Sequence, residues 1–138
     1  MTPRVVYDTN VVASATLKAG SVPASLVTLA LDRRVRLCLS SGIFAEYEAV
    51  LKRPKFAFDA HAVDTFLHDL QRVAVMVFPA KQVHVAPHEP DNRFLECAQA
   101  ARAQYLVTGN KKHFPFSVFQ GTHVVSPSEF ARIVTKQP

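Results

Sequence analysis

The stretch VVYDTN, residues 5–10, is the most informative part of this chain of 138 residues. Its three consecutive apolar residues are typical of a strand that is buried on both faces of a parallel sheet, because a half-exposed strand alternates apolar and polar residues. Asp8 ends the apolar run, and Asn10 is the expected N-cap of a helix over residues 11–18. The stretch therefore predicts a buried strand whose carboxyl end carries an aspartate.

Strands and helices are predicted to alternate along the rest of the chain. Strands separated by helix-length segments form a parallel sheet with helices on both faces. We therefore expect a single α/β domain over residues 1–138, with a three-layer α/β/α fold and a central, mostly parallel sheet of about five strands. The expected strands are 5–7, 36–40, 73–79, 105–108 and 122–126, and the expected helices are 11–18, 23–32, 42–52 (capped by Ser41), 59–72, 91–103 and 127–135.

Composition excludes several classes of protein. A 49% hydrophobic chain with a net charge of +5 is neither disordered nor of low complexity. No run reaches the ~18 apolar residues of a membrane span, and the N-terminus lacks the pattern of a signal peptide. Cys38 and Cys97 lie in apolar stretches and form no CxxC pair. We therefore expect buried thiols in a reducing compartment, the cytoplasm, and no membrane association.

The charge balance favours a polyanionic partner. The chain has 16 Lys and Arg against 11 Asp and Glu, and its pI is ≈ 9.5. Residues 70–138 carry 8 basic and 4 acidic side chains, and so supply four of the five net positive charges. Nucleic acid is the first candidate partner, and a basic surface that serves only solubility is the alternative.

Helix capping, a purely structural role, does not fully explain two of the aspartates. Asp8 lies at the carboxyl end of a strand, where α/β sheets bind their ligands, and Asn10 already offers a helix cap. Asp91 opens a helix and shares a face with Phe94 and Leu95, at positions i+3 and i+4, so it is expected to point toward the core. Helix capping is the alternative for both aspartates, and we favour a metal-binding or catalytic role.

Glu46 is the third carboxylate of interest. Its neighbour Glu48 has Lys52 at i+4, a favourable ion pair, whereas Glu46 has no basic residue at i±3 or i±4. Glu96 has Arg93 at i−3 and is expected to be solvated. Glu46 is therefore the better candidate for a shared acidic site.

Carboxylates that converge at one edge of a sheet repel each other unless a cation neutralises them. Oxygen ligands suit Mg²⁺ or Mn²⁺ rather than zinc. Such an ion lowers the pKa of a bound water and stabilises an in-line displacement at phosphorus. An acidic site within a basic protein thus predicts phosphodiester chemistry, because the basic surface holds the polyanion while the metal masks the acids.

The order and spacing of four segments resemble those of the PIN domain. They are Asp8-Thr9-Asn10 after a strand, Glu46 in the third helix, Asp91 with Phe94 and Leu95, and LVTGNK (residues 106–111) after a strand. The likeness extends from Val5 to about Ile133, and is greatest to PIN-family toxin components of bacterial toxin–antitoxin systems, relatives of VapC. The resemblance implies a small three-layer fold and a metal-dependent ribonuclease, often dimeric and inhibited by an antitoxin.

The same resemblance implies roles for individual residues. The implied metal ligands for Mg²⁺ or Mn²⁺ are Asp8, Glu46 and Asp91, and the implied catalytic residues are these three and Asn110. The expected substrate-binding residues are Thr9, Asn10, Thr108, Lys111 and Lys112, with the lysines as point charges for backbone phosphates. Many PIN domains have a fourth acid after the fourth strand, where this chain offers Asn110 and His113. Asparagine removes one negative charge, so a second metal ion should bind more weakly.

For the residues that follow the expected strand 105–108, structural alternatives stay open. Asn110 next to Gly109 is also typical of a turn, and Lys111 and Lys112 also fit an ordinary solvated pair. The histidines other than His113 show no metal-ligand spacing, and we assign them no chemistry.

The leading hypothesis is an Mg²⁺- or Mn²⁺-dependent endoribonuclease that hydrolyses RNA phosphodiester bonds with metal-activated water. By resemblance it is the toxin of a toxin–antitoxin pair, and its expected partners are RNA, a protein antitoxin and a second copy in a homodimer. An alternative is a catalytically weak or inactive PIN-like protein that binds RNA or has a regulatory role. A third hypothesis is a phosphotransfer domain with a nucleophilic aspartate, and Asn10 in place of a second aspartate counts against it.

Overall fold

A computed structural model describes residues 2–136 and contains one six-stranded sheet with the order β3-β2-β1-β4-β6-β5. Neighbouring strands are parallel except for β5, which is antiparallel to β6. The strands are β1 (Arg4–Tyr7), β2 (Arg36–Leu39), β3 (Val75–Met76), β4 (Tyr105–Val107), β5 (Val118–Phe119) and β6 (Thr122–Val125). The α-helices are α1 (Thr9–Leu17), α2 (Val22–Leu31), α3 (Ser41–Leu51), α4 (Ala60–Val73), α5 (Asn92–Ala101) and α6 (Pro127–Thr135).

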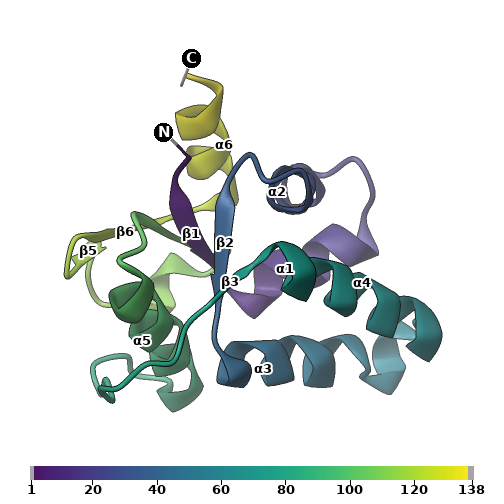
Figure 1. Ribbon diagram of the computed structural model, residues 1–138, viewed down its shortest axis with the longest axis horizontal. Coiled ribbons are helices and arrows are strands. Elements are labelled where there is room, and N and C mark those ends of the chain that lie inside the picture. The colour runs from purple at the N-terminus through teal and green to yellow at the C-terminus, as the bar shows by residue number, and fades with distance from the viewer. Residues whose placement is uncertain (1, 137–138) are drawn as a thin grey trace.

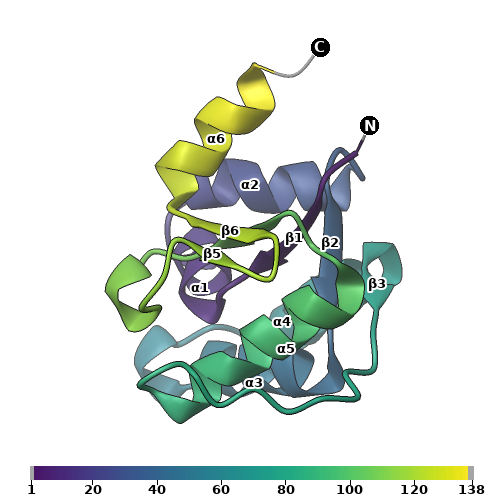
Figure 2. The same ribbon diagram turned by 90° about the vertical axis from the view of Figure 1, so that its left-hand side faces the viewer.

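Helices cover both faces of the sheet, which confirms the predicted α/β/α layers. Helix α5 packs on one face against β1, β2 and β4, while α1, α2 and α4 lie on the other side (Figure 1). Figure 2, turned by 90°, shows α5 in front of the sheet and α2 and α6 together at one end. The chain steps to one side of β1 to reach β2 and to the other side to reach β4. The strand order therefore reverses between β1 and β4.

The expected strand over residues 73–79 is much shorter in the structure. Helix α4 continues through Val73, and only Val75 and Met76 pair with β2. The helix continues because its apolar face, which includes Leu67 and Leu70, is buried against the core. The apolar run VAVMVFP therefore belongs partly to a helix end, which its hydrophobicity alone did not reveal.

Strand β5 was not expected from the sequence. It forms a hairpin with β6 through Gln120 and Gly121, which have φ values of 50° and 85°. Two consecutive left-handed residues are typical of the tight turns that fit the twist of a hairpin. The sequence signal for such a turn is usually Asn-Gly or Asp-Gly, so the Gln-Gly pair in this chain gave little indication.

Two helix caps differ from the predicted ones. Helix α1 begins at Thr9, so Asp8 and not Asn10 occupies the N-cap position, and the Asp8 side chain makes no capping hydrogen bond. Helix α3 begins at Ser41, and its cap is Ser40, whose hydroxyl oxygen accepts a backbone N–H of the first turn. The earlier start of α1 leaves the side chains of both Asp8 and Asn10 available for other contacts.

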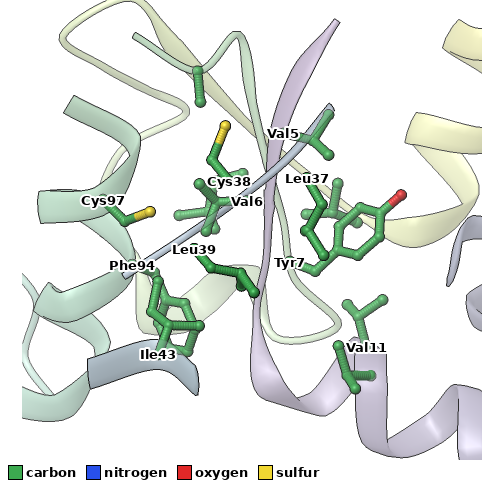
Figure 3. Packing of buried hydrophobic residues seen from close by; sticks show 14 of the residues in the cluster. Val5, Val6, Tyr7, Val11, Leu37, Cys38, Leu39, Ile43, Phe94 and Cys97 are labelled. Carbon is green, nitrogen blue, oxygen red and sulfur yellow. The ribbon is translucent and has the colours of Figure 1, made fainter. Parts of the chain in front are cut away.

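Strand β1 lies at the centre of the buried apolar core. Val5 and Tyr7 point to one face of the sheet and Val6 to the other, as the two-residue period of a strand requires (Figure 3). All three side chains are fully buried. Cys38 and Cys97 are unpaired and buried in the same cluster, which confirms the predicted burial of both thiols.

Two buried tyrosines join the end of β1 to the helices beside it. The Tyr47 hydroxyl of α3 donates to the Tyr7 carbonyl, and the Tyr7 hydroxyl donates to the Leu26 carbonyl of α2 at 2.9 Å. Burial raises the pKa of both hydroxyls, so both stay neutral donors. These bonds fix the position of the residue that follows β1, which is Asp8.

The helices of the described chain are short. The longest α-helix in residues 2–136 is α4, with 14 residues. No single helix in this range is long and apolar enough to cross a membrane, although α1 and α2 together, bent by 105°, meet that test of length and composition.

We predict that Tyr47→Phe lowers the free energy of unfolding by about 1–3 kcal/mol, because the buried Tyr7 carbonyl loses its hydroxyl donor. Urea denaturation followed by circular dichroism measures the change. Tyr105→Phe is the matched control, since the Tyr105 ring packs on Phe130 but its hydroxyl makes no hydrogen bond within residues 2–136. The control should change stability by less than about 0.5 kcal/mol. Equal effects of the two substitutions would contradict the role given to the Tyr47 hydroxyl.

Candidate active site

The side chains that follow β1 and β4 meet where the strand order reverses. Asp8 follows β1, Thr108 follows β4, and the Thr108 hydroxyl donates to Asp8 Oδ2 at 2.7 Å. The main chain continues the pairing, with the Asp8 N–H donating to the Val107 carbonyl at 2.9 Å. Open α/β sheets form their ligand crevice at such a reversal, outside the carboxyl ends of the strands. Asp8 therefore lies where the topology predicts a binding site.

Burial raises the pKa of Asp8 to about 6. The Thr108 hydroxyl and the backbone N–H of Asn10 oppose this shift by stabilising the carboxylate, whereas the negative charges of Asp91 and Glu46 add to it. The three carboxylates that the sequence singled out are thus close enough to interact. A cation between them would relieve the repulsion.

Asp91 is buried at the end of a 3₁₀ turn (Glu89–Asp91) that leads into α5. It occupies the N-cap position of α5 but makes no capping hydrogen bond, which contradicts the capping alternative. Its Oδ2 atom is buried and has no hydrogen-bond partner in the described chain, and His113 Nδ1 lies 3.3 Å away as an ion-pair contact. Burial raises the pKa of Asp91, while His113 and His88 lower it. Asp91 thus offers an unsatisfied oxygen to the site.

Glu46, on α3, is held by the first turn of α1. The Thr9 hydroxyl donates to Glu46 Oε2, and the glutamate is half-buried. Glu48, two residues further along the same helix, pairs instead with Lys52 at 3.0 Å, as predicted. The absence of a local basic partner therefore distinguished the glutamate that faces the other acids.

The two threonines that are predicted to bind substrate each contact a carboxylate at this edge. Thr9 and Thr108 are buried, and each donates its hydroxyl to a carboxylate, so their geometry favours positioning of the acids. Asn10 accepts the Gly109 N–H on Oδ1 at 3.0 Å and donates from Nδ2 to Asp8 Oδ2 at 3.5 Å. A Cβ at Gly109 would lie 3.4 Å from Asn10 Oδ1, at the limit of ordinary van der Waals contact.

Asn110 and His113 form a linked pair beside Asp91. Asn110 Nδ2 lies 2.8 Å from His113 Nε2. The donor and acceptor roles in this contact depend on the histidine tautomer, and the other ring nitrogen, Nδ1, faces Asp91. The Asn110 N–H donates to the Thr108 hydroxyl oxygen at 3.0 Å. The sequence pointed to both residues but not to this chain of contacts, because a 3₁₀ turn (Lys111–His113) directs the histidine back toward the acids.

The two lysines differ in their surroundings. Lys111 Nζ pairs with Glu129 Oε1 at 2.9 Å, whereas Lys112 is exposed and forms no ion pair within residues 2–136. A hollow of about 310 Å³ lies beside them, and its lining residues are Asn10, Val11, Ser14, Pro23, Gly109, Asn110 and Pro127. Of the two lysines, Lys112 is the more available to a polyanion.

The prediction of a solvated Glu96 is wrong. Glu96 is 8% exposed, accepts the Val83 N–H at 2.9 Å and pairs with Arg93 at 2.9 Å. Asn92, which sequence reasoning missed, is also buried, and its Oδ1 accepts two backbone N–H groups of the loop between β3 and α5. Helical periodicity could not reveal these roles, because the partners are backbone groups of a distant loop.

The donor set fits a hard divalent cation. Asp8 and Asp91 are buried carboxylates with raised pKa values, and Asp91 Oδ2 is unsatisfied. Such oxygens are what Mg²⁺ and Mn²⁺ bind. Within residues 2–136, no three His, Cys, Asp or Glu side chains form a ready-made cluster for a metal ion. Asp8, Glu46 and Asp91 are therefore not arranged as a three-ligand metal centre in this structure.

A sequence model of the PIN domain family matches residues 4–112. The chain belongs to the PIN domain family. The matched range contains both strands that flank the crevice and all three acids. The family predicted from the sequence is therefore confirmed.

Two known proteins are similar to this PIN domain. The uncharacterized protein MJ1680 of Methanocaldococcus jannaschii is 26% identical over 111 residues, which cover 78% of this chain and 71% of that protein. The crystal structure of VapBC2 from Rickettsia felis, bound to a DNA fragment from its promoter, contains a chain that matches with a TM-score of 0.60 and 14% identity. The match covers 89% of this chain and 98% of that chain, and at this identity it shows a shared fold.

The raised pKa of Asp8 predicts how stability depends on pH in the absence of metal. The folded protein binds this proton more tightly than the unfolded chain, in which an aspartate has a pKa of about 3.9. The free energy of unfolding therefore falls by roughly 2–3 kcal/mol as the pH rises from about 4 to about 6. Asp8→Asn should remove this fall.

Urea denaturation in EDTA between pH 4 and pH 8 measures the effect as the difference in the free energy of unfolding between the wild type and Asp8→Asn. The contributions of titrating groups that do not interact with Asp8 cancel in this difference. Glu48→Gln is the control and should keep the pH profile of the wild type. A profile for Asp8→Asn that coincides with the wild type would show that Asp8 does not titrate in this range.

Proposed function

We propose that this PIN domain is an endoribonuclease that requires Mg²⁺ or Mn²⁺ and hydrolyses RNA phosphodiester bonds. The observation that carries the proposal is the meeting of two buried carboxylates, Asp8 and Asp91, at the crevice beside β1 and β4. Buried acids of like charge destabilise the metal-free protein, and a cation that they bind for catalysis explains their presence. Membership of a family of nucleases supports a hydrolase.

Each acid has a defined part in this proposal. Asp8 and Asp91 would hold the ion, and Glu46, held by Thr9, would contribute the third carboxylate. When bound, Mg²⁺ or Mn²⁺ supplies an activated water and offsets the charge that develops at phosphorus. Thr108 fixes the direction of the Asp8 carboxylate through its donated hydrogen bond.

The polar residues around the acids would bind and orient the substrate. Asn10 and Asn110 line a hollow that none of the three acids lines, where their amides can hydrogen-bond to water or phosphate oxygen. Lys112 is exposed, and Lys111 lies beside it in an exposed ion pair that a phosphate can replace. This arrangement would hold the RNA backbone at the edge of the sheet without selecting a base.

We also propose that the protein is the toxin of a toxin–antitoxin pair, with a protein antitoxin as its partner and a homodimer as its assembly in the cytoplasm. The shared fold with a chain of VapBC2 supports this biological role. Exposed apolar side chains of Leu17 and Val22, on α1 and α2, support a protein contact on that side. Light scattering coupled to size-exclusion chromatography tests the homodimer.

A second candidate function is RNA binding without cleavage. The observation that favours it is Asn110, a neutral residue at the position of a fourth acid, which leaves three carboxylates to hold the metal. This alternative predicts that the protein binds RNA in EDTA and leaves it intact in millimolar Mn²⁺.

We predict that millimolar Mg²⁺ or Mn²⁺ raises the midpoint of thermal unfolding by several degrees, since a ligand at about 100 times its Kd adds about 2.7 kcal/mol. Asp91→Asn should abolish the rise and the cleavage of RNA. Glu48→Gln, which removes an acid outside the site, should preserve both. An absent thermal shift together with absent cleavage at high Mn²⁺ would exclude the nuclease and favour RNA binding.

We also predict that Asn110→Asp increases the affinity for Mg²⁺ by roughly tenfold, or 1.4 kcal/mol, because it returns a fourth negative charge to the site. The midpoint of a Mg²⁺ titration followed by thermal unfolding measures this affinity. Gln71→Glu adds the same charge on the exposed face of α4 and should leave the midpoint unchanged. If both variants shift the midpoint equally, the effect is one of net charge and Asn110 lies outside the metal site.

A further inference from the structure

A second charged region lies at the opposite edge of the sheet, where the parallel strands begin. Strand β1 begins with Arg4 and β2 with Arg36, and these two residues are direct partners in the pairing of the strands. Like charges side by side on neighbouring strands repel each other. Neither arginine forms an ion pair within residues 2–136. The structure therefore holds two uncompensated positive charges together.

Arg33 adds a third positive charge to this region. It follows α2 with a φ of 58°, a left-handed conformation that is uncommon for a residue with a side chain. A hollow of about 550 Å³ opens here, and its lining residues are Thr2, Arg4, Arg33, Arg36, Val75 and Gln104. The neighbouring acid, Asp32, does not line the hollow and forms no ion pair in the described chain.

The lining of this hollow is suited to phosphate groups. Arginine binds phosphate with two parallel hydrogen bonds, and no carboxylate among the lining residues would repel a phosphate. Arg4 is anchored, because its Nη1 donates to the Ala101 carbonyl at 2.9 Å and its remaining guanidinium N–H groups stay available. No aromatic ring lines the hollow, so it offers no platform for stacking a base. Its three arginines therefore suit a phosphate backbone, and the hollow offers no base preference through stacking.

We propose that this hollow binds the phosphodiester backbone of an RNA strand, independently of base sequence, at a distance from the candidate active site. The choice of RNA as the polyanion rests on the proposed function. Arg4 and Asp8 mark the two ends of β1, roughly 13 Å apart at about 3.3 Å per residue. Because helices cover both faces of the sheet, a strand that reaches both sites must pass around them. Only RNA that extends beyond the cleaved segment contacts the hollow.

The test is the binding of a labelled single-stranded RNA of about 20 nucleotides, followed by fluorescence anisotropy in EDTA so that no metal-dependent cleavage occurs. The double variant Arg33→Gln/Arg36→Gln should weaken binding by about tenfold or more. It should also reduce the slope of log K against log salt by about 0.7 for each phosphate that the variant no longer neutralises. The variant Arg33→Lys/Arg36→Lys should keep most of the salt dependence, because it keeps both charges.

The matched control is Arg53→Gln/Lys55→Gln, which removes two positive charges from exposed residues after α3. It should change the affinity by less than about twofold. Equal weakening in both glutamine variants would overturn the proposal, since binding would then follow net charge alone. Unchanged binding in Arg33→Gln/Arg36→Gln would overturn it as well. Urea denaturation checks that each variant is folded, and removal of the Arg4–Arg36 repulsion should leave stability equal or higher.

ATP and inorganic pyrophosphate separate a free phosphate ligand from RNA. If either binds the wild type below millimolar concentration, and Arg33→Gln/Arg36→Gln loses that binding without losing affinity for RNA, the assignment of the hollow to RNA is wrong. The outcome of the RNA-binding test is independent of the active-site proposal. Loss of metal-dependent cleavage in Asp91→Asn reports on the proposed function, whereas RNA binding in EDTA reports on the arginine hollow.

Discussion

The parallel pairing of β1 with β4 is the constraint on which the candidate site depends. Strand β1 is paired on both sides, its apolar side chains are fully buried, and the Tyr47 hydroxyl holds the carbonyl of its last residue. The connections that leave β1 and β4 diverge, and the hydrogen bond from Thr108 to Asp8 bridges the crevice between them. Main-chain pairing thus fixes Asp8, so its carboxylate can be held in surroundings that raise its pKa.

Charge is separated along the length of the central strands. Acids gather where β1 and β4 end, and arginines gather where β1 and β2 begin. Neither group stabilises the isolated chain, because burial and repulsion oppose the ionised acids and the paired arginines repel each other. The apolar core between the two ends of the strands supplies stability that outweighs the destabilising effects of the acids and of the arginines. Under our two proposals, each set of like charges would be neutralised by a ligand of opposite charge, a cation where the strands end and phosphate where they begin.

Periodicity and spacing predicted the architecture because the buried strands and amphipathic helices each satisfy a local rule. The same rules failed where the partner is distant in sequence. Glu96 has a basic neighbour on its own helix, yet it is buried because a loop offers it the Val83 N–H. Strand β5 depends on the left-handed conformation of Gln120, a residue that seldom marks such a turn. The acids of the candidate site were accessible to sequence reasoning, since one follows a strand and another lacks a local partner, but the contact of His113 with Asp91 arises only from the fold.

In our proposal, Asn110 takes the place of a fourth acid, which would affect the charge of the site more than its geometry. Asn110 donates one N–H to Thr108, which in turn donates to Asp8, and its amide directs His113 toward Asp91. Through Thr108 and His113, this residue is therefore linked to both buried aspartates. Asp91 Oδ2 is buried, and its nearest polar neighbour is His113 Nδ1 at 3.3 Å, so a cation that binds this oxygen would share it with the histidine or displace it. With one charge fewer, such an ion is attracted less strongly, while the oxygen that would receive it is already in place.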